Sequence, residues 1–147
     1  GDWEGTIAES YRVIEMSDDE AYAYYNAGYG LAMLGDNEEA IAAFTKAQEL
    51  DPSDKYHTAG LAWSLAKAGM RDSSLAVLAD VPREGAYMKE IAIVYGELGD
   101  MDAAFAILDQ AAEDYPGSIG MLETDHSAAP LKADPRYDEL RAKVGLE

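Results

Sequence analysis

The chain has 147 residues and no cysteine, which excludes disulfides, thiolate chemistry and cysteine-based zinc sites. Its 29 Asp and Glu against 11 Lys and Arg give a formal net charge of −18. This charge disfavours binding to nucleic acid, because phosphates are neutralised by clustered basic side chains. The sequence shows neither an apolar run long enough to span a membrane nor a signal peptide, and we expect a cytoplasmic location.

Two interpretations of the acidic charge stay open. Solvent-exposed faces of helices are rich in Glu and Asp, and a protein from an organism that lives in high salt would carry more of them. Alternatively, the acidic field attracts a basic partner.

Small residues recur along the chain at nearly constant spacing. Glycines stand at positions 1, 35, 69 and 99, at intervals of 34, 34 and 30 residues. The same intervals separate Thr6, Ala40, Ser74 and Ala104. Self-similarity at this period predicts a stacked array of helix-turn-helix units. Because Gly1 falls in the middle of a unit, we expect the chain to be cut from a longer protein.

The first 20 residues form half a unit. They predict one helix over residues 2–16, of the type that stands second in each unit, without its first helix. Trp3, Ile7, Val13 and Ile14 give this helix an apolar face. Because that face lacks a partner helix, self-association through residues 2–16 is a possible use of it.

Residues 21–54 form the clearest unit and predict helices over residues 20–34 and 37–50. Gly35 is expected to end the first helix, and Pro52 follows the second helix, which it could not continue. The unit resembles a tetratricopeptide repeat at every marker position, namely Tyr24, Gly28, Leu31, Ala40, Phe44, Ala47 and Pro52. The small members allow two helices to approach closely, and the large members fill the space between them.

Two further units follow. Residues 55–84 are four residues short and predict helices over residues 54–68 and 71–80, with Gly69 at the turn. Residues 85–118 predict helices over residues 84–98 and 101–114, with Gly99 at the turn.

Residues 119–147 are expected to form a loop and a capping helix. Residues 117–133 show no helical period, whereas Asp134-Pro135 predicts an N-cap followed by proline at the first helical position. Gly145 should end the helix. Repeat arrays need terminal caps, so this helix should cover the end of the stack. The segment from Ile91 to Gly145, with its Asp-Pro-Arg-Tyr-x-x-Leu motif, resembles the C-terminal tails of bacterial signalling proteins such as class III adenylate cyclases, winged-helix regulators and Ser/Thr kinases.

The resemblance to tetratricopeptide repeats implies an all-α fold, a right-handed α-α superhelix in one domain spanning residues 1–147. It also implies a concave groove lined by the first helix of each unit. Carried over by position, the groove residues that we single out for peptide binding are Tyr22, Tyr25, Asn26, Tyr29, Tyr56, Trp63, Lys67, Lys89 and Ile93. Aromatic side chains with a polar atom are enriched at recognition sites, although they also fill gaps between helices.

Catalytic patterns are lacking. His57 and His126 have no helical histidine partner, and we expect both on a solvent-exposed loop or at a helix start. We therefore expect no enzyme activity, cofactor or metal. Tyr25 and Tyr29 replace the Lys and Asn with which one subclass of these repeats clamps chaperone tails, so that partner is not expected. The sequence predicts a scaffold that binds a peptide or helix, with a structural element for self-association or domain coupling as the alternative.

Overall fold

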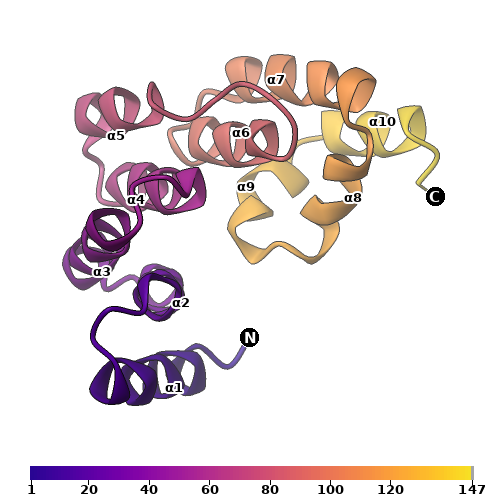
Figure 1. Cartoon of the computed structure of the whole chain (residues 1–147). Helices are drawn as coiled ribbons and strands as arrows, with labels where there is room; N and C mark the ends of the chain where they lie inside the picture. Colours follow the sequence, from indigo (N-terminus) through magenta and orange to yellow (C-terminus); the bar gives the residue numbers. More distant parts are fainter. Residues whose placement is uncertain (147) are drawn as a thin grey trace. The chain divides into compact units, whose positions relative to one another are not determined.

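The computed structural model describes residues 1–146, which contain helices and no strand (Figure 1). The chain divides into two compact units, one formed by residues 1–80 and the other by the residues from Val81 onwards. The boundary falls inside the predicted unit 55–84. Each unit has its own core, and each is described in turn.

The first compact unit contains five helices. They are α1 (Trp3–Met16), α2 (Ala21–Leu34), α3 (Asn37–Leu50), α4 (Lys55–Lys67) and α5 (Arg71–Leu78). Each helix packs mainly against its neighbours in the chain. The five predicted helices are confirmed, with ends that differ by no more than two residues.

Glycines end the first helix of each pair, as predicted. Gly35, Gly69 and Gly99 adopt φ values of 89°, 76° and 77°, a left-handed conformation that favours glycine. The chain then turns at once into the second helix. Regular pairs of helices therefore follow from the glycine spacing.

Phe44 lies at the centre of the first unit. Its side chain is fully buried in α3, between Gly28 of α2 and Gly60 of α4. A Cβ atom at Gly28 would lie 3.0 Å from the ring, and a Cβ at Gly60 would collide with it. One aromatic ring thus fills the space that two glycines leave open on either side.

The second compact unit begins with a pair formed by α6 (Tyr87–Glu97) and α7 (Met101–Asp114). The prediction that residues 117–133 lack helix is wrong. They fold into α8 (Gly117–Thr124), the 3₁₀ turn His126–Ala128 and α9 (Ala129–Lys132). All three pack against α6, and Leu131 of α9 contacts Gly96. These helices are too short to show a clear apolar period in the sequence.

The last helix, α10 (Arg136–Lys143), packs against α7, α8 and α9. The helix begins one residue later than predicted, with Pro135 at the N-cap and Arg136 at the first helical position, while the Asp134 carboxylate accepts a hydrogen bond from the Arg136 backbone N–H at 3.0 Å. Tyr137 and Leu140 are buried, and Gly145 ends the segment with φ 78°. A helix at the predicted place is therefore present, and it packs against α7 and the two short helices before it.

Candidate functional site

An aromatic row, which we define as Trp3, Tyr29 and Trp63, joins three helices of the first unit. The Trp3 and Tyr29 ring centroids are 5.7 Å apart, and those of Tyr29 and Trp63 are 5.3 Å apart with 30° between the planes. The Lys67 ammonium lies 5.4 Å from the Trp63 ring centroid, which is within range of a cation–π interaction. The row therefore brings together Tyr29, Trp63 and Lys67 of the predicted groove, but the expectation that Trp63 is open to a peptide does not fit its burial, since the side chain is only 4% exposed.

A tyrosine pair lies nearer the start of α2. The Tyr22 and Tyr25 rings stack with centroids 6.3 Å apart and 13° between the planes. Tyr22 is 69% exposed, whereas Tyr25 is half-buried and its ring also contacts Phe44 and His57. One ring of this pair belongs to the core, and the other offers an open aromatic surface.

His57 stands at the start of α4 but is not solvent-exposed. Its side chain is buried, with Nδ1 3.3 Å from the Asp51 carbonyl oxygen and Nε2 3.8 Å from the Asp54 carboxylate. Of the two expected placements, a solvent-exposed loop or a helix start, the structure has the helix start, and the buried ring contacts that of Tyr25 with centroids 5.6 Å apart. His126 is exposed, as expected.

Tyr56 and Asn26 lie in the first unit but outside the aromatic row. Tyr56 is half-buried in the first turn of α4, and its backbone N–H donates to Asp54 at 2.9 Å. Asn26 is half-buried and lines a hollow with residues of α1.

Lys89 and Ile93 lie in α6 of the second unit and are both buried, Ile93 to 2% exposure. The Lys89 ammonium lies 2.5 Å from Asp125 and 2.7 Å from Glu90. The expectation that these residues line an open groove does not fit this placement, because α8, the 3₁₀ turn and α9 cover α6. The uncovered groove candidates are therefore confined to the first unit.

The Lys89 ammonium lies between two carboxylates, those of Glu90 and Asp125. Burial lowers the Lys89 pKa, but the carboxylates of Glu90 and Asp125 outweigh it and leave the pKa above its ordinary value. Burial raises the pKa of Glu90, against the opposing effect of Lys89. Burial also raises the Asp125 pKa, yet Lys89 and hydrogen bonds from Ser127 bring it below its usual range. This cluster fastens the tail to α6.

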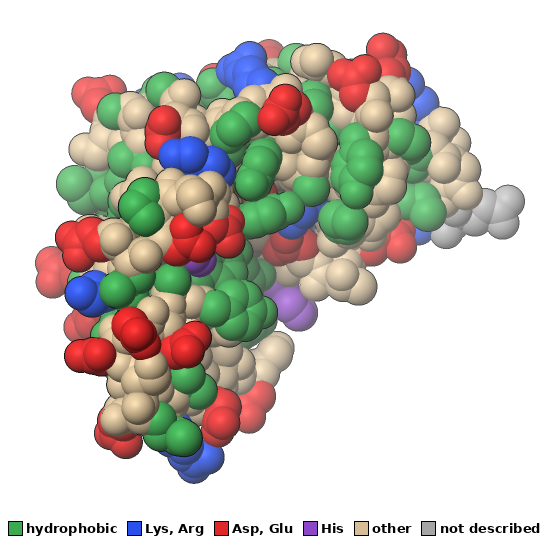
Figure 2. Space-filling view, viewed as in Figure 1, with side chains coloured by type: hydrophobic (Ala, Val, Ile, Leu, Met, Phe, Trp, Pro, Cys, Tyr) green, Lys and Arg blue, Asp and Glu red, His purple; other side chains and the backbone are tan. Residues whose placement is uncertain are grey.

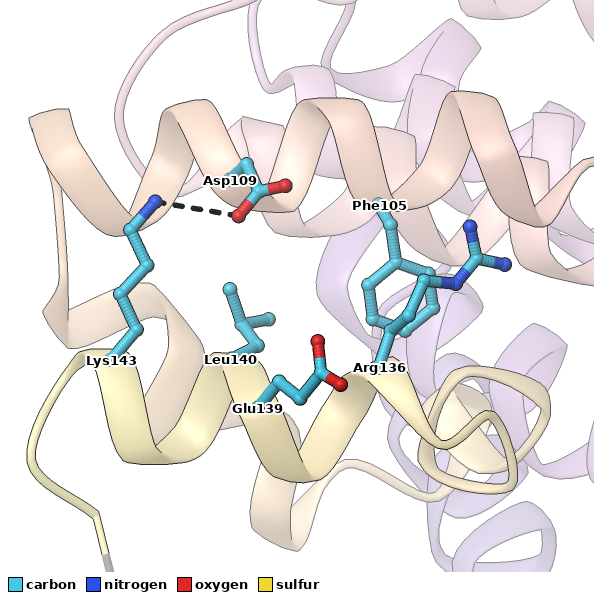
Figure 3. A pocket seen from close by; sticks show the side chains of 6 residues that line it. All are labelled: Phe105, Asp109, Arg136, Glu139, Leu140 and Lys143. Atoms are coloured by element: carbon cyan, nitrogen blue, oxygen red, sulfur yellow. Dashed lines mark hydrogen bonds and ion pairs between the residues drawn. The ribbon is translucent and has the colours of Figure 1, made fainter.

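A second hollow, of about 210 Å³, lies between α7 and α10 (Figure 3). Figure 3 shows Lys143 directed at Asp109, 3.3 Å away, and the Arg136 side chain beside the Phe105 ring, with 4.6 Å from its guanidinium carbon to the ring centroid. Arg136 also pairs with Asp102 and Asp134. These contacts hold the capping helix, and the basic groups already have acidic partners.

Metal-binding clusters and membrane-spanning helices are both absent from the part of the chain that is described. Residues 1–146 contain no cluster of His, Asp and Glu that could hold a metal ion. Within the same residues, no helix has both the length and the apolar character to cross a membrane.

The sequence did not single out three residues that shape these sites. Trp3 was assigned only to the apolar face of residues 2–16, although it opens the aromatic row. The ion pairs of Lys89 with Glu90 and Asp125 were not predicted, because Asp125 is 36 residues from Lys89 along the chain. A buried lysine position inside a helical repeat is the one signal that would have prompted a search for acidic partners.

Comparison with known families finds two matches. Residues 21–54 match a tetratricopeptide repeat, with the predicted bounds, and residues 90–118 match a second tetratricopeptide repeat model. No curated protein matches the chain significantly. Repeats of this kind generally mediate protein–protein interactions, and their folds are typically non-catalytic. The chain thus carries tetratricopeptide repeats within an all-helical fold of the α-α solenoid type.

Proposed function

We propose that the first unit is a scaffold that binds a peptide or helix of another protein on the side of α2 and α4 that carries their aromatic residues. The observation that carries the proposal is the aromatic row, in which Tyr29 stacks on the buried Trp63 ring and Trp3 packs against Tyr29 at a tilt. Trp and Tyr bury large areas at little cost in conformational entropy and keep a polar atom for hydrogen bonding. Tyr22 adds an exposed ring beside the same helix.

Charge and rigidity support this proposal. Stacking holds Tyr29 and Trp63 in place before a partner arrives, and ordering costs on binding are then small. Lys67 places a positive group at one end of the row, where it can meet a carboxylate of the partner. The proposal therefore concerns recognition by preformed rings rather than catalysis.

The test begins with peptides selected from a displayed random library for binding to the intact chain. Tyr22→Ala and Tyr29→Ala should weaken the selected peptides, while Tyr11→Ala should not, because Tyr11 is an exposed tyrosine of similar character on α1, outside this surface. Circular dichroism confirms that each variant stays helical. Equal binding by all three variants would refute the assignment.

We also propose that the chain belongs to a cytoplasmic bacterial signalling or regulatory protein. This proposal rests on the resemblance of the tail, whose Asp134, Pro135, Arg136, Tyr137 and Leu140 build the start of α10. Sequencing the gene upstream of Gly1 tests it. A cyclase, kinase or winged-helix domain would support it, whereas further repeats alone would contradict it.

A further inference from the structure

A third hollow, which we call the tyrosine groove, lies between α1 and α3 of the first unit. It measures about 230 Å³ and is lined by Tyr11, Tyr24, Glu39, Ala42, Ala43 and Lys46. Tyr11 stands on α1, Tyr24 on α2 and the other four residues on α3. None of the six belongs to the aromatic row or to the predicted peptide-binding set, so the proposed function leaves this groove unused.

The groove takes all its walls from residues 11–46. The repeat spacing would place a helix before α1 beside Ser10, which corresponds to Phe44, because α2 packs on Phe44 through Gly28. The hollow at Ser10 and Asn26 shares no lining residue with the tyrosine groove. The walls of the groove are therefore the same whether or not a further helix precedes α1.

The size of the groove fits one aromatic side chain. A cavity of about 150 Å³ can hold a benzene ring, whereas pockets for whole small molecules usually measure about 300–1,000 Å³. Tyr11 is 44% exposed and Tyr24 is half-buried, so both rings can pack against a third ring. Ala42 and Ala43 carry only methyl groups, which leave the space between the tyrosines and α3 open.

Two opposite charges border the groove. Glu39, Ala42, Ala43 and Lys46 follow the spacing i, i+3, i+4 and i+7, so they share one face of α3. The two charged residues are two turns apart, about 10 Å along the helix axis. Both side chains are exposed, and neither has an ion-pair partner within residues 1–146. They are therefore available to a ligand.

Lys46 distinguishes the groove from its surroundings. It is the only basic residue of α3, which carries three glutamates. Acidic side chains recur over the visible face of the molecule (Figure 2). A helix with basic residues alone would meet complementary charge in many places, whereas an acidic residue meets its complement at Lys46. Charge complementarity therefore requires an occupant with both signs.

The spacing of the charges fits a helical occupant. Side chains at i, i+3 and i+7 of a partner helix also share one face, and the outer two are as far apart as Glu39 and Lys46. Acidic residues favour the N-terminal end of a helix and basic residues the C-terminal end. A helix antiparallel to α3 meets both preferences, with its acidic residue opposite Lys46 and its basic residue opposite Glu39.

We propose that the tyrosine groove binds one helix of a partner protein, antiparallel to α3, with an acidic, an aromatic and a basic residue in that order on one face. The aromatic side chain enters between Tyr11 and Tyr24. The acidic side chain pairs with Lys46, and the basic side chain pairs with Glu39. This interface is a second recognition site, lined by other residues than the aromatic row.

The test uses a synthetic helical peptide with Glu, Phe and Lys at positions i, i+3 and i+7. Its binding to the intact chain is followed by fluorescence anisotropy. Tyr11→Ala removes one wall and should weaken binding about ten-fold, whereas Met16→Ala, an exposed residue of α1 outside the groove, should leave it within about two-fold. Ala42→Phe should block the peptide by filling the groove. Since Ala42 is exposed, the variant should stay folded, which circular dichroism checks.

Exchange of charges tests the pairing. Glu39→Lys should weaken binding about ten-fold, whereas Glu38→Lys, the same change at an exposed position outside the groove, should leave it within about two-fold. A peptide with its Glu and Lys exchanged should bind the double variant Glu39→Lys, Lys46→Glu better than it binds the parent protein. Equal losses for Glu38→Lys and Glu39→Lys would overturn the proposal in favour of diffuse electrostatic attraction.

Two further arms separate the alternatives. The peptide with Gly in place of Phe should bind at least ten-fold more weakly, and undiminished binding would overturn the aromatic occupant. Tyr22→Ala should have no effect on this peptide, whereas a peptide at the aromatic surface should respond to Tyr22→Ala and not to Tyr11→Ala. The opposite response of the Glu-Phe-Lys peptide would assign it to the aromatic surface and overturn the proposal.

Discussion

Gly60 of α4 packs directly against the Phe44 ring of α3, so closely that any side chain at position 60 would meet the ring. Phe44 is fully buried and cannot swing away into solvent. Gly60→Ala should therefore lower the free energy of unfolding. Overpacking costs about 1–3 kcal/mol, and the better helix propensity of Ala returns about 1 kcal/mol of this. Urea unfolding of the intact chain measures the difference.

Gly117→Ala is the matched control. Gly117 begins α8, is exposed, has no positive φ and would have no atom within 4 Å of its added Cβ. The free energy of unfolding of this variant should stay unchanged or rise by up to about 1 kcal/mol. If Gly60→Ala proved as benign as Gly117→Ala, the close contact with Phe44 would not constrain the fold.

Lys89→Met should destabilise the second unit strongly. The substitution leaves Glu90 and Asp125 facing each other in a buried place without their cation. Removing one partner of a buried ion pair costs about 3–5 kcal/mol. Thermal unfolding of the intact chain should show an early transition that is absent from the unsubstituted protein.

Lys55→Met provides the comparison for that loss. Lys55 pairs with Asp80 at 2.7 Å, but the Asp80 side chain is 65% exposed. Surface ion pairs contribute about 0–1 kcal/mol, so this variant should unfold almost as the parent does. Similar losses in both variants would show that burial adds nothing to the Lys89 cluster.

The helical pairs could be predicted from the sequence because their signals are local. Gly35, Gly69 and Gly99 end helices through their own backbone freedom, and the apolar period shows which face of each helix is buried. The bounds of α3 and α7 therefore match their predicted ranges in full.

The burial of Lys89 and Ile93 could not be predicted from such local signals. Their burial depends on α8, the 3₁₀ turn and α9, which return to α6 from more than 20 residues away along the chain. Position within a repeat describes the contacts between neighbouring repeats, and it says nothing about a tail that covers one of them. The contact between Trp3 and Tyr29 could not be predicted either, because it joins two different helices and leaves no local pattern in the sequence.

Tyr137→Phe should leave the protein as stable as before or slightly more stable. Tyr137 is 5% exposed, and its hydroxyl oxygen is buried without a hydrogen-bond partner among the described residues. An unsatisfied buried polar atom costs about 1–3 kcal/mol, and Phe removes that atom while it keeps the ring. Leu140→Ala, a truncation on the same buried face of α10, should cost about 2–5 kcal/mol. A clear loss in Tyr137→Phe would reveal a partner for the hydroxyl.

Asp134 should titrate well below the ordinary pKa of an aspartate. The Arg136 side chain donates to both of its carboxylate oxygens, the Arg136 backbone N–H adds a further bond, and together they lower the pKa of Asp134 from 3.8 to about 2. Because this pKa is lower in the folded state than in the unfolded state, the stabilisation is present above pH 3.8. It is lost as the pH falls from 3.8 towards 2.

Carbon NMR of the Asp134 carboxyl group measures this pKa directly. Arg136→Met should raise it from about 2 towards 3.8, since the guanidinium is the largest cause of the shift. Arg141→Met removes a cation of the same helix that pairs with Glu123, so it should leave Asp134 unchanged. A parent Asp134 that titrates near 3.8 would mean that Arg136 does not hold the carboxylate in solution. The start of α10 would then depend on the burial of Tyr137 and Leu140 alone.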